Sequence, residues 1–183
     1  MCLPVLVKNI ARLRPSLSDS VAQTLIHAFI TSRLDYCNGV LSGVHSKTLA
    51  RLQYVQNSAV RLLTRTKPWQ HITPTLIHLH WLPVKSRIHF KTLLLTYKSL
   101  HTIAPQYLTD LLHPYTPSRS LRSSDTGLLS IPRSRLRTVG DRAFSVAAPT
   151  LWNALPPEIR NAASLDIFKS ALKAHLFTLA FGP

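Results

Sequence analysis

Acidic residues are scarce in this sequence. Its 183 residues include seven Asp and Glu against 22 Lys and Arg, which gives a formal net charge of +15. Polymerases, nucleases and glycosidases use paired carboxylates to hold metal ions or to move protons. The seven acids form no adjacent pair and no D-x-D motif. We therefore expect no active site within this chain, and the excess of positive charge predicts a polyanionic partner.

Cysteine is even scarcer. Cys2 and Cys37 lie far apart and form no C-x-x-C pair, which argues against a disulfide framework and against a zinc knuckle. Among the nine His, the densest group is His78 and His80 with His71 nearby, but no carboxylate or cysteine accompanies it. We therefore expect neither a metal site nor a cofactor.

Long apolar runs are missing as well. No stretch approaches the about 18–20 apolar residues that span a bilayer, and residues 2–7 are too few for the apolar region of a signal peptide. The segment with Lys169, Lys173, Phe168 and Phe177 carries too little charge for a membrane-surface helix. We expect an intracellular protein, nuclear or cytoplasmic, without a membrane span, and nucleic acid is the favoured polyanion.

The residues that are present predict a mainly α fold. With 45% hydrophobic residues the chain is long enough to bury a core. Ser, Thr and Pro repeatedly stand just before apolar runs of helical spacing, where N-caps and first-turn prolines are found. The expected helices begin at Ser18, with a bend before 34–41, and cover 46–64, 74–82, 84–100, 105–112, 143–155 and 164–177.

The composition changes between residues 115 and 142, a segment that we call the basic loop. It is rich in Ser, Arg and Gly, and Leu128–Ile131 is expected to pair with Arg135–Val139 as a small β hairpin across Pro132. The sequence thus predicts a helical region over 1–114, the basic loop over 115–142, and a C-terminal helical tail over 143–183.

A basic stripe is expected along the helix over 46–64 and the residue after it. At 100° per residue, six polar side chains fall within about 40° of a line that faces away from the leucines. Ordinary exposed faces mix both signs of charge, whereas this one has four cations and no acid. A nucleic-acid backbone would relieve that repulsion, although a merely solvated face is the alternative. The six are Lys47, Arg51, Tyr54, Ser58, Arg61 and Arg65.

The basic loop is a second candidate contact with nucleic acid. If residues 133–137 are extended, three guanidinium groups share one face, and arginine suits bidentate phosphate contacts. A flexible arginine-rich linker is the alternative. Against Asp125 and Asp141, the loop carries Arg119, Arg122, Arg133, Arg135, Arg137 and Arg142.

One tryptophan differs from the other two in its surroundings. Trp69 follows Lys67 and Pro68 in a polar turn after the basic helix, so we expect Lys67 and Trp69 near a bound nucleic acid. Trp81 and Trp152 stand in apolar helical contexts, which predicts that they pack in the core.

Five runs of sequence carry a family resemblance. In order and spacing they resemble the C-terminal region of the reverse transcriptase polyprotein of LINE-type non-LTR retrotransposons, of the Jockey superfamily type. The runs are SRLDYCNGVLSG (32–43), LQYVQNSAVRLLTRT (52–66), HITPTLIHLHWLPVKSRIHFKTLLLTYKSL (71–100), YTPSRSLRSSDTGLLSIPRSRLRTVGDRAFSVAAPTLWNALP (115–156) and FKSALKAHLF (168–177).

The resemblance implies a parent polyprotein with an endonuclease, a reverse transcriptase whose palm aspartates hold two metal ions, and then a helical thumb-like and tail region that corresponds to this chain. No F-x-D-D or Y-x-D-D motif occurs here, so the parent's activities are not implied for this chain. By resemblance, residues 46–66 belong to the thumb, which lies against the template–primer duplex.

The expected function is therefore non-catalytic, sequence-nonspecific binding of RNA or of an RNA–DNA hybrid. A palm-bearing reverse transcriptase acting in trans is a further expected partner. Two alternatives stay open: a decayed remnant without selected function, and a protein-interaction module that uses the apolar surface where a palm once packed.

Overall fold

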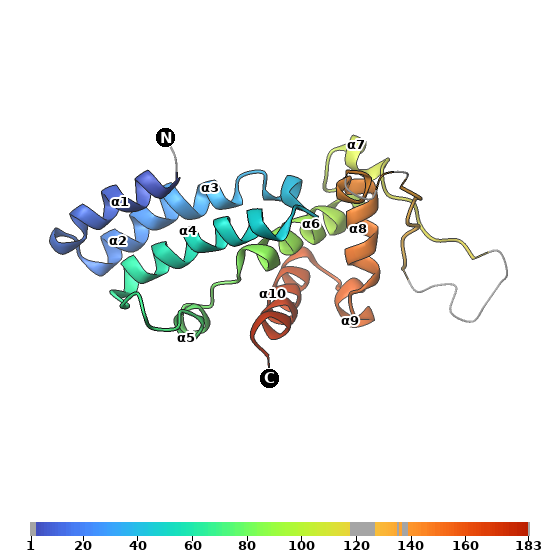
Figure 1. Cartoon of the computed structure of the whole chain (residues 1–183). Coiled ribbons are helices and arrows are strands. Elements are labelled where there is room, and N and C mark those ends of the chain that lie inside the picture. The colour runs from blue at the N-terminus through green and yellow to red at the C-terminus, as the bar shows by residue number, and fades with distance from the viewer. Residues whose placement is uncertain (1–2, 118–126, 135, 137–138, 183) are drawn as a thin grey trace. The chain divides into compact units, whose positions relative to one another are not determined.

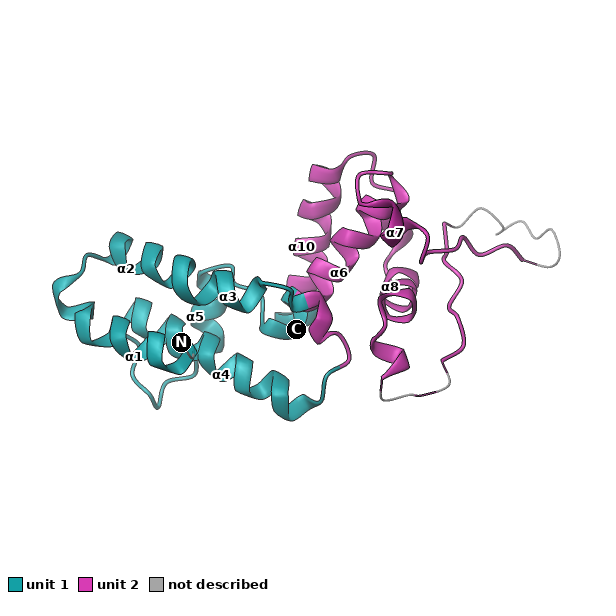
Figure 2. Ribbon diagram, turned by 90° about the horizontal axis from the view of Figure 1, so that it is seen from above, with its two compact units in different colours: residues 1–38, 44–87, 179–183 teal, residues 39–43, 88–178 magenta. Residues whose placement is uncertain are grey.

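The protein is mainly α-helical in the computed structural model, as the sequence predicts (Figure 1). The structure describes residues 3–117, 127–134, 136 and 139–182. The chain divides into two compact units (Figure 2). Unit 1 comprises residues 1–38, 44–87 and 179–183, and unit 2 comprises residues 39–43 and 88–178. This division follows contacts in space, whereas the segments expected from the sequence followed changes of composition.

Unit 1 contains a long helix over residues 19–35 whose hydrogen-bonding pattern changes along its length. Ser18 caps its start, with its Oγ accepting a hydrogen bond from the amide of Val21 at 3.4 Å. A π-helical turn over His27–Thr31 lies between the two α-helical stretches of this helix, and the helix ends at Asp35 rather than continuing to residue 41, where a separate 3-10 turn over Asn38–Leu41 follows. The helices of unit 1 are α1 (Leu3–Leu13), α2 (Asp19–Ile26), α3 (Ser32–Asp35), α4 (Ser46–Thr64) and α5 (Thr73–His78), followed by the start of α6 (Val84–Leu100).

The core of unit 1 comes from the apolar faces of α1, α2, α3 and α4. Its buried members are Ile10, Ala22, Ile26, Ile30, Leu34, Val55, Ala59 and Leu63, and Trp81 packs half-buried against them. Helices α1 and α4 run side by side and in the same direction (Figures 1 and 2). Their first turns therefore lie at the same end of unit 1.

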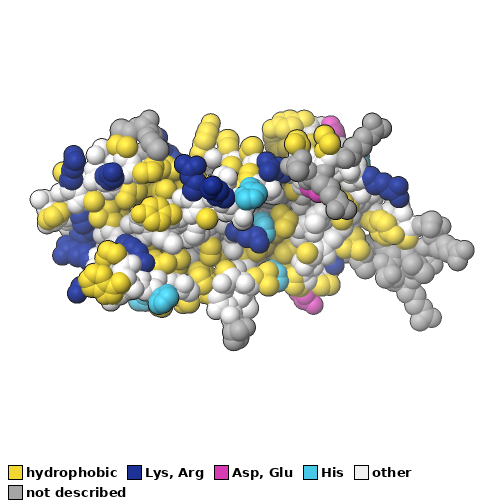
Figure 3. Space-filling model, viewed as in Figure 1, with side chains coloured by type: hydrophobic (Ala, Val, Ile, Leu, Met, Phe, Trp, Pro, Cys, Tyr) yellow, Lys and Arg dark blue, Asp and Glu magenta, His cyan; other side chains and the backbone are white. Residues whose placement is uncertain are grey.

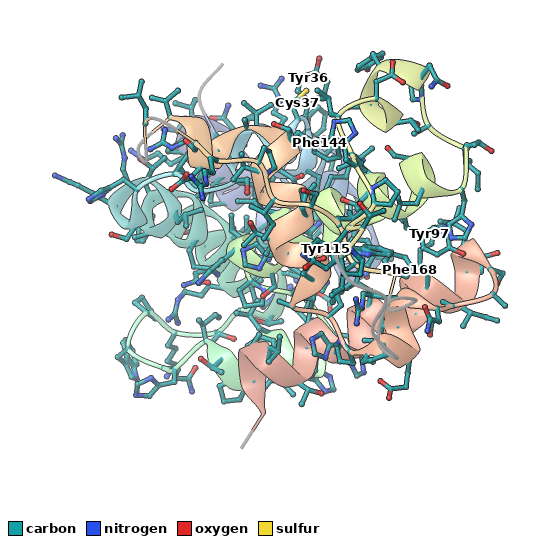
Figure 4. All side chains as sticks on the ribbon, turned by 90° about the vertical axis from the view of Figure 1, so that its right-hand side faces the viewer. Tyr36, Cys37, Tyr97, Tyr115, Phe144 and Phe168 are labelled. Atoms are coloured by element: carbon teal, nitrogen blue, oxygen red, sulfur yellow. The ribbon has the colours of Figure 1, made fainter. Side chains whose placement is uncertain are left out.

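Unit 2 has an aromatic centre. The rings of Tyr97 and Phe168 stack with their centroids 4.3 Å apart (Figure 4), and the hydroxyl of Tyr97 donates to the carbonyl of Ala162 at 2.9 Å. Trp152 packs on Phe168, as expected of a core tryptophan. The helices of unit 2 are the remainder of α6 (Val84–Leu100), α7 (Gln106–Thr109), α8 (Phe144–Asn153), α9 (Pro157–Arg160) and most of α10 (Leu165–Phe181).

The expected β hairpin between Leu128–Ile131 and Arg135–Val139 is wrong, because Leu128–Ile131 pairs with another part of the chain. Leu129 instead forms an isolated antiparallel bridge with Pro114. The side chain of Asn153 accepts from the Leu129 amide at 2.9 Å and donates to the Leu129 carbonyl at 2.8 Å. Helix α8 thus satisfies both polar groups that a second hairpin strand would have satisfied. Arg135, Arg137 and Thr138 lie outside the described residues.

Candidate nucleic-acid interface

The basic stripe lies on the exposed side of α4. His45 precedes the helix, and its ring nitrogen Nδ1 accepts a hydrogen bond from the amide of Lys47 at 3.2 Å. Lys47 and Arg51 are exposed, and 72% of Tyr54 is accessible to solvent. The opposite face carries the buried residues Val55, Gln56, Ala59, Val60 and Leu63. The first half of the stripe is therefore accessible to a large ligand.

Arg61 differs from the other cations because its guanidinium group binds the chain itself. Its Nη1 donates to the carbonyl of Lys67 at 2.5 Å and its Nη2 donates to the carbonyl of Gln70 at 2.8 Å. These two bonds tie the turn over 67–70 to the last turns of α4. Arg61 is thus a brace for this turn, a role that the sequence pattern did not indicate.

The braced turn presents Lys67 and Trp69 to solvent. Within it, the amide of Gln70 donates to the Lys67 carbonyl at 3.1 Å, and the Gln70 side chain accepts from the Lys67 amide at 3.0 Å. The ammonium group of Lys67 lies 5.2 Å from the centroid of the Trp69 ring, within the range of a cation–π contact. Trp69 is 75% exposed. The turn is therefore an ordered site with an aromatic ring and a cation.

Arg65 lies just past the end of α4 with a positive φ of 53°. Its side chain is exposed, and its charge helps to lower the pKa of Asp19. The larger cause of that lowered pKa is Arg14, which hydrogen-bonds to the carboxylate and attracts it electrostatically. Arg65 therefore extends the stripe beyond the helix.

A buried arginine stabilises the end of the same helix. Arg14 is only 5% exposed, and its Nε and Nη2 donate to the carbonyls of Leu62 and Leu63 at 3.0 and 3.1 Å. The last carbonyls of a helix have no partner within the helix, so a cation here satisfies both hydrogen bonding and the helix dipole. No pattern in the sequence distinguishes Arg14 from its exposed neighbour Arg12.

The acids of unit 1 are already paired. Asp19 forms an ion pair with Arg14, and Asp35 forms one with Arg87, whose Nε lies 2.8 Å from Asp35 Oδ1. These are the two acids in the sequence of unit 1, which also contains eleven Lys and Arg, so its formal charge is +9. On the face that Figure 3 shows, Lys and Arg side chains clearly outnumber Asp and Glu. In the described part of unit 1, both acids thus have an arginine outside the stripe as their ion-pair partner, and Asp19 also attracts Arg65.

An open groove of about 570 Å³ lies between the first turns of α1 and α4. Its floor and walls are mainly apolar, and three members of the basic stripe stand along it. The lining consists of Leu3, Pro4, Lys47, Thr48, Ala50, Arg51, Leu52, Tyr54 and Val55. No feature of the sequence indicated this groove, because it depends on α1, which was not among the expected helices.

The basic loop is described only in part. Arg133 is exposed, as a nucleic-acid contact would require. Arg142 instead binds within unit 2, where its Nε donates to the carbonyl of Gly43 at 3.1 Å. Arg119, Arg122, Arg135 and Arg137 lie outside the described residues. The structure thus brings together the α4 stripe and the turn after it within unit 1, whereas Arg133 belongs to unit 2.

The described part of the chain contains no group of three or more His, Cys, Asp or Glu placed to hold a metal ion. Of the helices that the structure describes, none is long and apolar enough to cross a membrane. Compared with known proteins, the chain matches no family model, no curated protein and no solved structure.

Proposed function

We propose that this chain binds RNA or an RNA–DNA hybrid through the α4 stripe and the turn after it, without base-edge readout and without catalysis. We further propose that it is related to the C-terminal region of LINE-type reverse transcriptases, on the strength of the five sequence runs. The observation that carries the binding proposal is the exposed cationic face of α4 in a unit whose two acids are already paired.

The dimensions of the stripe suit a nucleic-acid backbone. From Lys47 to Arg65 the helix rises about 27 Å, at about 1.5 Å per residue. Along the axis of B-form DNA each strand has one phosphate per about 3.4 Å, so a stripe that is parallel to this axis is about as long as eight nucleotides. Lys47 and Arg51 lie about 6 Å apart along the helix and Arg65 lies about 21 Å further on, so these three cations, with Lys67 from the turn, can meet phosphates near the two ends of this span. Such contacts fix the position of a nucleic acid without reading its sequence.

A salt series tests this proposal. The affinity of the purified chain for a fluorescent RNA–DNA hybrid is measured by anisotropy between about 50 and 200 mM salt. Four phosphate contacts predict that log K falls against log salt with a slope of about −3.6, because each contact contributes about −0.9. The test variant is Lys47→Gln with Arg51→Gln and Arg65→Asn, and we expect it to lose most of the slope.

The substitutions are chosen to leave the fold intact. Asn tolerates the positive φ at position 65 better than Gln does, and Arg61 is left unchanged because it braces the turn. A matched control removes three exposed charges elsewhere, at Lys85, Lys91 and Lys173, each changed to Gln. The proposal is rejected if the folded wild type does not bind, or if the control loses as much affinity as the test variant.

A further inference from the structure

The groove between α1 and α4 differs from the rest of the stripe because it combines cations with an apolar cavity. We infer that it holds one unpaired nucleotide of a single-stranded nucleic acid, with the base against Tyr54 and the apolar floor and the phosphate at Lys47 and Arg51. This inference rests on the proposed nucleic-acid binding and adds to it a preference for single strands at this end of α4.

The electrostatics of the groove favour an anion. Lys47 and Arg51 lie one turn apart on α4, and both line the groove. The first turns of α1 and α4 also line it, and the N-terminus of an α-helix carries about half a positive charge. No Asp or Glu is among the lining residues. A phosphate group therefore meets favourable potential from two side chains and from two helices.

The apolar part of the groove favours a ligand with a flat ring. Leu3, Pro4, Leu52 and Val55 supply the apolar lining, and Tyr54 stands beside Arg51 with 72% of its surface exposed. A base in a duplex is already stacked and paired, so only an unpaired base can enter such a groove. Stacking of a base on an aromatic side chain changes affinity by about 5-fold to about 150-fold, as alanine substitutions of such side chains show.

The volume is also adequate. A groove of about 570 Å³ lies within the range of about 300–1,000 Å³ that is usual for small-ligand sites. An acidic peptide or an anionic lipid would use the cations but would gain nothing specific from the exposed ring of Tyr54. A second copy of this chain would have to bring an acidic, apolar segment, and a chain with seven acids among 183 residues has little to offer for that purpose.

The test uses a single-stranded oligonucleotide that contains the fluorescent base 2-aminopurine, whose emission is quenched on stacking. We expect the full chain to bind this probe and to quench it. Tyr54→Ser should weaken binding at least about 5-fold and abolish the quenching, whereas Tyr54→Phe should retain both. Ala50→Leu, a charge-neutral change at an exposed position in the groove, should also weaken binding. Tyr107→Ser is the matched control, because Tyr107 is 67% exposed in unit 2.

Each outcome decides the inference. Unchanged binding and quenching by a folded Tyr54→Ser variant would overturn it, while salt-sensitive hybrid binding would leave the proposed function standing. Displacement of the probe by polyglutamate or by anionic phospholipid vesicles as readily as by unlabelled single strand would overturn it too, since charge alone would then explain binding. The inference would also be overturned if the chain formed a dimer and Ala50→Leu dissociated it, since a second copy would then occupy the groove. Failure of the folded wild type to bind either single strand or hybrid would reject both proposals.

Discussion

Arg14 illustrates how one side chain can hold a helix end in a chain dominated by positive charge. It is buried, and it donates hydrogen bonds to the carbonyls of Leu17, Leu62 and Leu63 as well as to Asp19. Arg14→Met keeps the volume but leaves the carbonyls without their donor, so we expect the free energy of unfolding to fall by about 2–4 kcal/mol. Urea denaturation followed by circular dichroism measures this loss. Arg12→Met, at an exposed position, should change stability by less than about 0.5 kcal/mol.

Asp19 links the same contact to pH. Arg14 lowers the pKa of Asp19 in the folded protein below its ordinary value of 3.8. The ionised carboxylate therefore stabilises the fold above the pKa of the unfolded chain, and this contribution is lost as the pH falls through the lower folded pKa. When the pH is lowered from neutral to below about 3.8, the melting temperature of the wild type should fall further than that of Asp19→Asn. Thermal melts at several pH values measure this difference. Parallel pH profiles for the two proteins would contradict this.

The turn over residues 67–70 depends on a side chain of α4 for its conformation. Because Arg61 binds the carbonyls of Lys67 and Gln70, we expect Arg61→Ala to loosen the turn while α4 persists. Hydrogen exchange at the Gln70 amide, which is bonded to the Lys67 carbonyl, should accelerate in this variant. Arg51→Ala removes an equal charge from the same helix and should leave that exchange unchanged. Equal exchange in the wild type and Arg61→Ala would show that the turn does not need its brace.

A polar cluster joins α4 to the start of α6 in a similar way. Gln53 Oε1 accepts from the amide of Val84 at 2.9 Å, and the buried Gln56 donates to the carbonyl of Leu82 at 2.9 Å. Gln53→Leu removes the acceptor for an amide in the first turn of α6, so the free energy of unfolding should fall by about 1–2 kcal/mol. Urea denaturation measures this loss. Gln23→Leu, the same substitution at an exposed position on α2, is the control and should not lower the free energy of unfolding to the same extent.

The sequence predicted the elements that carry strong local signals. The boundaries of α4 and α6 agree with the expected 46–64 and 84–100, because apolar spacing and preceding cap or proline residues agree there. Helix α1 was missed although Leu3, Leu6, Val7 and Ile10 have helical spacing. Helix α5 ends at His78 rather than at residue 82, since the chain turns at His80 with a φ of 52°. That turn brings Leu82 to Gln56, a tertiary contact with no local signal.

The candidate site was only partly predictable for the same reason. Helical periodicity placed Lys47, Arg51 and Tyr54 on an exposed face, since that inference needs nothing beyond α4 itself. The same periodicity could not separate Arg61, which binds the turn, from the exposed Arg51. The groove is formed by two helices that are distant in the sequence, so no pattern within a single helix predicts it.

At the scale of the whole molecule, charge repulsion should outweigh charge pairing. The chain carries a net charge of +15, whereas its ion pairs include Arg14 with Asp19, Arg87 with Asp35, and Lys169 with Asp166, the last of which is largely exposed. Added salt screens both effects, and exposed pairs contribute little, about 0–1 kcal/mol each. Sodium chloride should therefore raise the melting temperature, by about 2–4 °C for each kcal/mol of repulsion that it removes. The variant with Lys47, Arg51 and Arg65 neutralised should show a smaller rise in the same melts, because its stripe holds less repulsion to screen. A melting temperature that falls with salt would mean that ion pairs such as Arg14 with Asp19, which screening weakens, matter more than the excess of positive charge.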